Sequence, residues 1–277
     1  MPSTKYSNER AWFKKWIIEG YSVRQLSSFC SHSPNKLRSI IHFNLDTSPQ
    51  SAFNLSHIKY LVFDGTYLFR RTGIVALMNA RTHSVIDGQY GVSESSPQHL
   101  HRFFNPIKER GLNPRSFTVD GNQSVIRCLK KIWPHITIQR CIVHIQRQGL
   151  SWCREKPKRY DAHKLRNIFL MLSFIKSHSD KQIFLDHFAN WEDHYGSKIA
   201  ISPERGWVFS DLKRARSMLI KAIPNMFHYL DDPFVPSSTN MIEGYFSRLK
   251  QHYRQHRGLS PNNRSNYFSW YFFFRPK

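Results

Sequence analysis

The stretch Leu61-Val62-Phe63-Asp64-Gly65-Thr66 places an aspartate and a glycine directly after three apolar residues. A second stretch, Phe117-Thr118-Val119-Asp120-Gly121-Asn122, repeats this arrangement. Short apolar runs rich in β-branched and aromatic residues indicate buried strands. We therefore expect each aspartate at the end of a buried strand, where open sheets with parallel strands bind their ligands.

Strand and helix signals alternate around these two stretches. The pattern predicts three strands in a meander, then helix, strand, helix and strand, over residues 59–69, 73–79, 84–92, 97–110, 115–119, 122–133 and 137–143. This order predicts an α/β protein whose mixed sheet has a parallel half and helices on both faces. The order βββαβαβ matches the ribonuclease H-like core.

Helical patterns dominate the rest of the chain. Residues 146–236 carry helical periodicity and almost no strand signal, which predicts an all-helical insertion. One more helix is expected over 237–256, followed by an aromatic tail to Lys277. The predicted division is a helical N-terminal region, a linker, the first part of the core, the insertion and the completion of the core, in residues 1–46, 47–57, 58–145, 146–236 and 237–277.

The N-terminal region contains two helix-start signals. Ser22-Val23-Arg24-Gln25 fits a capping box, and Ser33-Pro34 fits an N-cap followed by proline at the first helical position. Two short helices joined by a tight turn are typical of a helix-turn-helix, with Lys36 and Arg38 able to reach a DNA major groove. The alternative is an ordinary three-helix cap on the next domain, because many helical pairs share this spacing.

The charge balance points to a polyanionic partner. The chain of 277 residues carries 41 Lys and Arg against 19 Asp and Glu, a formal net charge of +22. Such an excess causes self-repulsion unless a partner neutralises it. DNA is the expected partner, and a basic surface that only aids solubility is the alternative.

Cysteine usage and the termini bear on the cellular compartment. The chain has four cysteines, Cys30, Cys128, Cys141 and Cys153. No two of them form a Cys-x-x-Cys pair, which argues against a disulfide framework. Residues 1–9 are polar without an apolar signal core, and the run 268–274 is too short to span a bilayer. We therefore expect a soluble, cytoplasmic, nucleoid-associated protein of bacterial type.

Asp64 and Asp120 together suggest a metal site. Two acidic side chains that converge at one sheet edge repel each other unless a cation lies between them. One Asp-Gly pair alone carries little weight, because the pair is common in turns and recurs as Asp87-Gly88 in the predicted outer hairpin strand. The pairing of two such strand ends is what predicts a divalent cation.

Glu243 is the third carboxylate that fits this site. It lies beside an apolar stripe at helical spacing, formed by Ile242, Phe246, Leu249 and Tyr253. Taken alone, Glu243 would be an acid placed favourably in the first turn of a helix. Ser247, Lys250 and Arg254 follow it at helical spacing, so a carboxylate and phosphate-binding groups would share one edge of the helix.

These motifs resemble the Mutator-like transposases of bacterial insertion sequences. The likeness covers Ile58 to the C-terminus. Its most specific parts are Phe63-Asp64-Gly65-Thr66, Val119-Asp120-Gly121, Cys141-Ile142-Val143-His144, Thr239-Asn240-Met241-Ile242-Glu243-Gly244, Arg248-Leu249-Lys250 and His256-Arg257-Gly258-Leu259. The resemblance implies a DDE transposase with a ribonuclease H-like fold, whose catalytic and metal-binding triad is Asp64, Asp120 and Glu243.

The expected chemistry is a two-metal phosphoryl transfer with two Mg²⁺ ions, for which Mn²⁺ can substitute. Asp64 would bridge the ions, with Asp120 on one and Glu243 on the other. The enzyme would cut the transposon end to free a 3′-hydroxyl, which then attacks target DNA. The expected phosphate-binding residues are Arg248, Lys250, Arg254 and Arg257. We expect a homodimer or higher oligomer on DNA.

Other residues have less certain roles. Cys141 and His144 have the spacing of half a zinc site, but Cys128, Cys153 and the histidines provide no convincing second pair, so packing or DNA proximity is favoured. Asn240 belongs to the family signature without an assigned role. The tryptophans considered for stacking on an unpaired base are Trp152, Trp191 and Trp207. Burial in the core is the commoner explanation for a tryptophan.

Two other functional classes fit parts of this pattern. A catalytically silent or domesticated DNA-binding regulator would keep the fold without the chemistry. A ribonuclease H-like nuclease would keep the triad and cut DNA without joining it. Joined products distinguish the transposase from the nuclease, and Mg²⁺-dependent nicking distinguishes both enzymes from the regulator.

Overall fold

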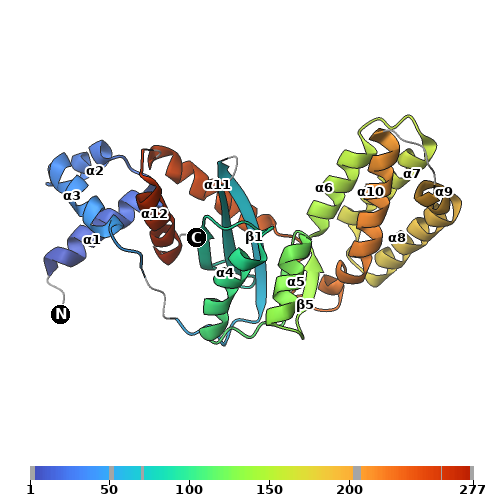
Figure 1. Cartoon of the computed structure of the whole chain (residues 1–277), viewed down its shortest axis with the longest axis horizontal. Coiled ribbons are helices and arrows are strands. Elements are labelled where there is room, and N and C mark those ends of the chain that lie inside the picture. Colours follow the sequence, from blue (N-terminus) through green and yellow to red (C-terminus); the bar gives the residue numbers. More distant parts are fainter. Residues whose placement is uncertain (1–3, 50–52, 70–71, 202–206, 257, 275–277) are drawn as a thin grey trace.

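The computed structural model describes residues 4–49, 53–69, 72–201, 207–256 and 258–274, with the side chains of 4–7, 69 and 207–209 outside the description. Figure 1 shows an elongated chain with three parts in a row. Helices from both ends of the sequence form one end, a β-sheet lies in the middle, and a bundle of helices forms the other end.

The described residues form one mixed sheet of five strands in the order β3-β2-β1-β4-β5. Its strands are β1 (Tyr60–Phe69), β2 (Thr72–Asn79), β3 (Val85–Tyr90), β4 (Ser116–Val119) and β5 (Thr137–Arg140). β1, β2 and β3 are antiparallel neighbours, whereas β1, β4 and β5 run parallel. The structure therefore confirms the predicted meander and parallel half.

Side chains alternate between the two faces of the sheet, as the strand period of two requires. Leu61 and Phe63 of β1 pack with α4 (Pro97–Glu109) and α5 (Gln123–Ile132) on one face. Tyr60 and Val62 belong to the core on the opposite face, where α11 (Asn240–Tyr253) and α12 (Pro261–Phe274) pack. Helices on both faces leave β1 buried on each side.

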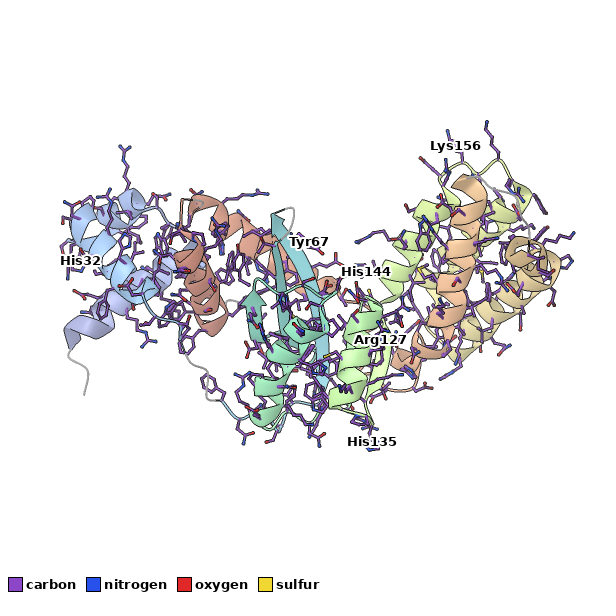
Figure 2. All side chains as sticks on the ribbon, viewed as in Figure 1. His32, Tyr67, Arg127, His135, His144 and Lys156 are labelled. Carbon is purple, nitrogen blue, oxygen red and sulfur yellow. The ribbon has the colours of Figure 1, made fainter. Side chains whose placement is uncertain are left out.

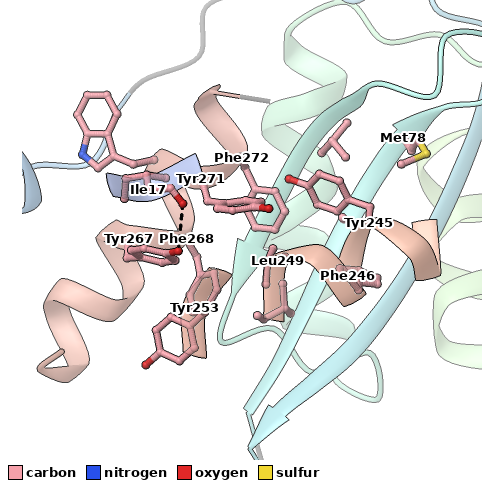
Figure 3. Packing of buried hydrophobic residues seen from close by; sticks show 14 of the residues in the cluster. Ile17, Met78, Tyr245, Phe246, Leu249, Tyr253, Tyr267, Phe268, Tyr271 and Phe272 are labelled. Carbon is pink, nitrogen blue, oxygen red and sulfur yellow. Dashed lines mark hydrogen bonds between the residues drawn. The ribbon is translucent and has the colours of Figure 1, made fainter. Parts of the chain in front are cut away.

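The three predicted N-terminal helices are present as α1 (Thr4–Glu19), α2 (Val23–Phe29) and α3 (Pro34–Leu45). Ser22 and Gln25 form the expected capping box, and Ser33 caps α3, which begins at a proline. These helices share one hydrophobic core with α11 and α12. In Figure 3 the Tyr267 hydroxyl of α12 donates to the Ile17 carbonyl of α1 at 3.2 Å.

The segment expected only as an aromatic tail is a helix, because residues 261–274 form α12. Figure 3 shows its Tyr267, Phe268, Tyr271 and Phe272 among the side chains of the same core. Neighbours lie on several sides, since α12 packs against α1, α3 and β3. A helix buried on several sides needs no polar face, so it lacks the amphipathic period that would have identified it.

In the part of the predicted insertion that the structure describes, all regular elements are helices joined by loops. Its helices are α6 (Ile142–Cys153), α7 (Tyr160–Met171), α8 (His178–Trp191), α9 (Ser197–Ile201) and α10 (Trp207–Ala222). Short 3-10 turns lie at Leu172–Phe174, Ile223–Asn225, His228–Leu230 and, beyond α11, Arg254–His256, and a π-helix covers Glu192–Gly196. These helices enclose a separate hydrophobic core.

The strand expected over 137–143 is too long. β5 ends at Arg140, Cys141 is the N-cap of α6, and the helix begins at Ile142. The Ile142 amide donates to the Ser237 carbonyl at 2.9 Å rather than to a neighbouring strand. Apolar residues after Arg140 belong to the core of the insertion, and a short apolar run cannot distinguish a strand from a buried helix.

Phe268 tests the shared core of the two chain ends. Its ring is fully buried and stacks on Tyr90 of β3 with centroids 5.0 Å apart. We expect Phe268→Ala to lower the free energy of unfolding by about 3–5 kcal/mol, because it removes apolar contact and leaves a cavity. Phe174→Ala is the control, since that ring is exposed and should change stability by less than about 0.5 kcal/mol. Equal effects in urea denaturation would contradict this packing.

Candidate active site

The register of β1 and β4 brings Asp64 and Asp120 together. The last residue pair of these parallel strands is Val62 with Thr118. In both segments an aspartate, Asp64 or Asp120, follows two residues later. Asp120 follows the end of β4, as predicted. Asp64 does not end its strand, because β1 continues to Phe69 in antiparallel pairing with β2. What ends near Asp64 is the pairing with β4.

Asp64 is almost completely buried, with 6% of its surface exposed. Its Oδ1 accepts a hydrogen bond from the Gly65 amide at 2.9 Å. Burial raises the pKa of Asp64 to about 7, and the nearby negative charges of Asp120 and Glu243 add to this rise. The Asp120 carboxylate accepts from the Asn122 amide at 2.8 Å. The two predicted aspartates therefore interact electrostatically.

Glu243 lies in the first turn of α11, as predicted, and faces two cations of α6. His144 Nε2 is 3.7 Å from one carboxylate oxygen, and Arg147 Nη2 is 3.8 Å from the other. The oxygen nearest His144 is buried and has no hydrogen-bond partner among the described residues. Arg147 carried no sequence signal of its own, because only the contact between α6 and α11 gives it a partner.

Cys141 and His144 meet Thr239, the N-cap of α11. The Thr239 amide and hydroxyl donate to the Cys141 sulfur at 3.3 and 3.5 Å, and the hydroxyl is 3.3 Å from His144 Nδ1. Figure 2 shows His144 where α6 leaves the sheet region. The Cys-x-x-His signature thus joins the start of the insertion to the start of the helix that carries Glu243.

This contact also sets the charge of the histidine. Its hydrogen bond with Cys141 raises the pKa of His144 to about 9, and the charges of Asp64 and Glu243 act in the same direction. Burial acts to raise the pKa of Cys141, but hydrogen bonds with His144 and Thr239 outweigh burial and lower it. His144 is therefore positively charged at neutral pH beside the acidic site.

The segment leading into α11 is tied to the parallel strands. The Thr118 hydroxyl of β4 donates to the Pro236 carbonyl at 2.8 Å. The Gln139 side chain of β5 donates to the Met226 carbonyl at 2.9 Å. Across β1, Lys250 Nζ donates to the Thr66 hydroxyl at 2.5 Å. These bonds hold α11 against the sheet although the whole insertion separates it from β5 in sequence.

Glu94 is a carboxylate that the sequence analysis missed. It lies in the loop between β3 and α4, and its carboxyl group is so close to Gly65 that a Cβ at that position would lie 2.7 Å from its carbon. Burial raises the pKa of Glu94 to about 8, and the charges of Asp120 and Asp64 raise it further. No local pattern marked Glu94, since only the tertiary structure brings its loop to β1.

Arg140 is a buried cation beside Asp120 that was also missed. A Cβ at Gly121 would lie 2.0 Å from its guanidinium, and the φ of Gly121 is +107°. Glycine is therefore favoured at 121 for two reasons: it adopts a positive φ readily, and it leaves room for the guanidinium of Arg140. Arg140 Nη2 lies 3.5 Å from the Asp120 carbonyl. Burial lowers the pKa of Arg140, against the opposing effect of the Asp120 charge.

The described members of the predicted DNA-binding set lie on α3 and on or directly after α11. Lys36 and Arg38 are exposed on α3, where Lys36 forms an ion pair with Glu9 at 2.8 Å. On α11, Arg248 is exposed and Lys250 is half-buried. The remaining members of the set are Arg254, exposed after α11, and Arg257, outside the described residues. Asn240 is exposed at the start of α11.

The tryptophans considered for base stacking differ in their surroundings. Trp191 is 3% exposed, and its indole donates to the Asp161 carbonyl at 2.9 Å, so it belongs to the core of the insertion. Trp152 is half-buried, and the Trp207 side chain is outside the description. The structure therefore supports the ordinary core explanation for Trp191.

Among the described residues, no three His, Cys, Asp or Glu side chains are grouped closely enough to hold a metal ion as they stand. In the same part of the chain, no helix is both long enough and apolar enough to cross a membrane.

The comparison with known families identifies the chain. The family described as Transposase, Mutator family matches residues 59–267, which include both aspartates, the Cys-x-x-His signature and Glu243. The chain belongs to the Mutator family of transposases. No curated protein matches it. In this Mutator-family transposase, helices α1, α2 and α3 lie outside the matched region.

The raised pKa of Asp64 predicts how stability depends on pH. The folded protein holds a proton on Asp64 up to about pH 7, whereas the ordinary pKa is 3.8. Stability from this group is therefore complete below about pH 4 and is lost as pH rises through about 7. In EDTA, we expect Asp64→Asn to reduce the loss of unfolding free energy between about pH 5 and pH 8 by roughly 1–3 kcal/mol. Equal losses of unfolding free energy over this pH range in the two proteins, measured by urea denaturation, would contradict this prediction.

Thr239 tests the contact between α6 and α11. Thr239→Val keeps the volume of the fully buried side chain but removes the hydroxyl that contacts Cys141 and His144. We expect a loss of about 1–2 kcal/mol in unfolding free energy. Thr47→Val, at an exposed position, should cost less than about 0.5 kcal/mol. An unchanged denaturation midpoint for Thr239→Val would show that the hydroxyl contributes nothing.

Proposed function

We propose that this Mutator-family transposase is a DDE enzyme that cleaves DNA at transposon ends and transfers the freed strand into target DNA. The observation that carries the proposal is the parallel register of β1 and β4, which brings Asp64 and Asp120 together beside the helix of Glu243. Nothing in DNA binding alone requires three carboxylates to converge within a protein of net charge +22.

The strand order supports a ribonuclease H-like core. Three antiparallel strands are followed by two parallel strands on the other side of β1, with helices between them in sequence. Helices α6 to α10 then separate β5 from the helix of Glu243. This order supports the proposal of a βββαβαβ core with a helical insertion before its last helix.

The site fits Mg²⁺, with Mn²⁺ as a substitute. Carboxylate oxygens are the ligands that these ions prefer. Asp64, Asp120 and Glu243 supply them, and the buried Glu243 oxygen without a hydrogen-bond partner is free to ligate. Two bound ions would supply activation of the attacking oxygen and stabilisation of the leaving oxygen. Because the acidic groups are not clustered for ligation as they stand, binding requires their side chains to turn toward a shared ion.

The protein residues have separate tasks in this proposal. Asp64 and Asp120 would hold the ions from the sheet, and Glu243 would complete the set from α11. His144 and Arg147 neutralise Glu243 in the metal-free protein and keep it near the sheet. No covalent protein intermediate is needed, because the attacking group would be first water and then the DNA 3′-hydroxyl.

DNA contacts are proposed on the same helix and on the N-terminal helices. Arg248 and Lys250 follow Glu243 along α11, Arg254 comes directly after the helix, and all three would bind phosphates near the cleaved bond. We propose that α2 and α3 act as a helix-turn-helix that presents Lys36 and Arg38. Binding as a dimer or larger assembly would allow two transposon ends to be processed together.

A strand-transfer assay on a transposon-end duplex with Mg²⁺ tests the triad. Asp64→Asn, Asp120→Asn and Glu243→Gln should each lower the rate by more than about a hundredfold, because metal ions supply several kcal/mol of transition-state stabilisation. DNA affinity should change little. Asp186→Asn, at an exposed position of the insertion, is the matched control and should retain full activity.

The products distinguish the proposal from its alternatives. Wild-type activity in all three triad variants would refute the residue assignment. Cleavage without joined products would identify a nuclease of the same fold. Tight DNA binding without Mg²⁺-dependent nicking in the unaltered protein would identify a regulator.

A further inference from the structure

Glu94 is held in place by a loop that is anchored on both sides. The Ser93 amide donates to His99 Nδ1 at 3.1 Å, and the Ser96 amide donates to the Ser93 carbonyl at 3.0 Å. On the other side, Val92 is buried, and its carbonyl lies against Gly73 of β2. The loop therefore directs Glu94 toward the sheet rather than into solvent.

Gly65 makes room for the Glu94 carboxyl group. A Cβ built on Gly65 would lie 2.7, 2.9 and 3.0 Å from the three atoms of that group. The backbone of Gly65 is an ordinary strand conformation paired with Val75, so glycine is not needed there for its φ. Its missing side chain leaves the space that the end of the Glu94 side chain occupies. The carboxyl group of Glu94 thus lies where a side chain of residue 65 would begin, directly beside Asp64 in sequence.

Glu94 forms no ion pair or hydrogen bond with another residue in the described ranges, and its side chain is half-buried. Its electrostatic neighbours include Asp120 and Asp64, whose charges oppose its ionisation, and His144, whose charge favours it. Ionised carboxylates that are partly removed from water beside one another repel. A divalent cation among these groups would relieve that repulsion.

We propose that Glu94 is a fourth carboxylate of the metal site and ligates a divalent cation together with Asp64 and Asp120. This inference rests on the proposed metal-dependent function. Glu94 reaches the site from the loop before α4, whereas the aspartates reach it from the sheet and Glu243 from α11. The cation would therefore be held by three separate parts of the fold.

Direct Mn²⁺ binding tests this without DNA or catalysis. Isothermal titration of the full chain with MnCl₂ should give a Kd at least about tenfold weaker for Glu94→Gln than for the unaltered protein, or one ion fewer. Glu109→Gln, an exposed residue at the end of α4, should bind as the unaltered protein does. In EDTA at about pH 9, where Glu94 is ionised in the folded protein, Glu94→Gln should be at least as stable as the unaltered protein, because it removes a negative charge beside Asp64 and Asp120.

A second variant serves if Glu94→Gln does not fold. Gly65→Ala keeps every carboxylate but places a methyl group where the Glu94 carboxyl group lies, so it should weaken Mn²⁺ binding by displacing Glu94. Unchanged binding in both variants, with weakened binding in Asp64→Asn and Asp120→Asn, would overturn the role of Glu94 alone. Unchanged binding in all four variants would overturn the metal site itself, and with it the proposed function.

Discussion

The parallel pairing of β1 with β4 is the constraint on which the rest of the site depends. It aligns Val62 with Thr118 and so brings the next acidic residues, Asp64 and Asp120, to the same edge of the sheet. Packing on both faces of β1 supports this register, because a slip by one residue would exchange its side chains between two differently packed cores. Hydrophobic packing thus holds the carboxylates of Asp64 and Asp120 near each other, and a bound cation can relieve the repulsion between them.

The helical insertion has its own core, yet its two ends meet. Cys141 at the start of α6 and Thr239 at the start of α11 are joined through the thiol, the hydroxyl and the His144 ring. This junction explains how Glu243 can lie beside the sheet although the helical insertion separates it from β5 in sequence. The ion pairs of His144 and Arg147 with Glu243 add to this junction, so packing at the start of α6 bears directly on the position of Glu243.

Both ends of the chain contribute to the core that supports α11. Phe13, Trp16 and Ile17 of α1 pack with aromatic residues of α12, and the same cluster contains Tyr245 and Leu249 of α11. The helices that carry Lys36 and Arg38 are therefore not an independent appendage within the described structure. A DNA duplex bound by them would be positioned relative to the helix of Glu243 by continuous side-chain packing.

The sequence by itself determined the strand and helix order, the two strand-associated aspartates, Glu243 in a first turn and the family, because these features are local patterns of a few residues. Tertiary structure alone decided the partners: Glu94 over Gly65, Arg140 beneath Gly121, and Arg147 beside Glu243. It also decided the states of residues 141–143 and 261–274, where a short apolar run and a helix buried on several sides carry no distinguishing period. The physical reason is that contacts between distant segments depend on packing and register, which no short stretch of sequence encodes.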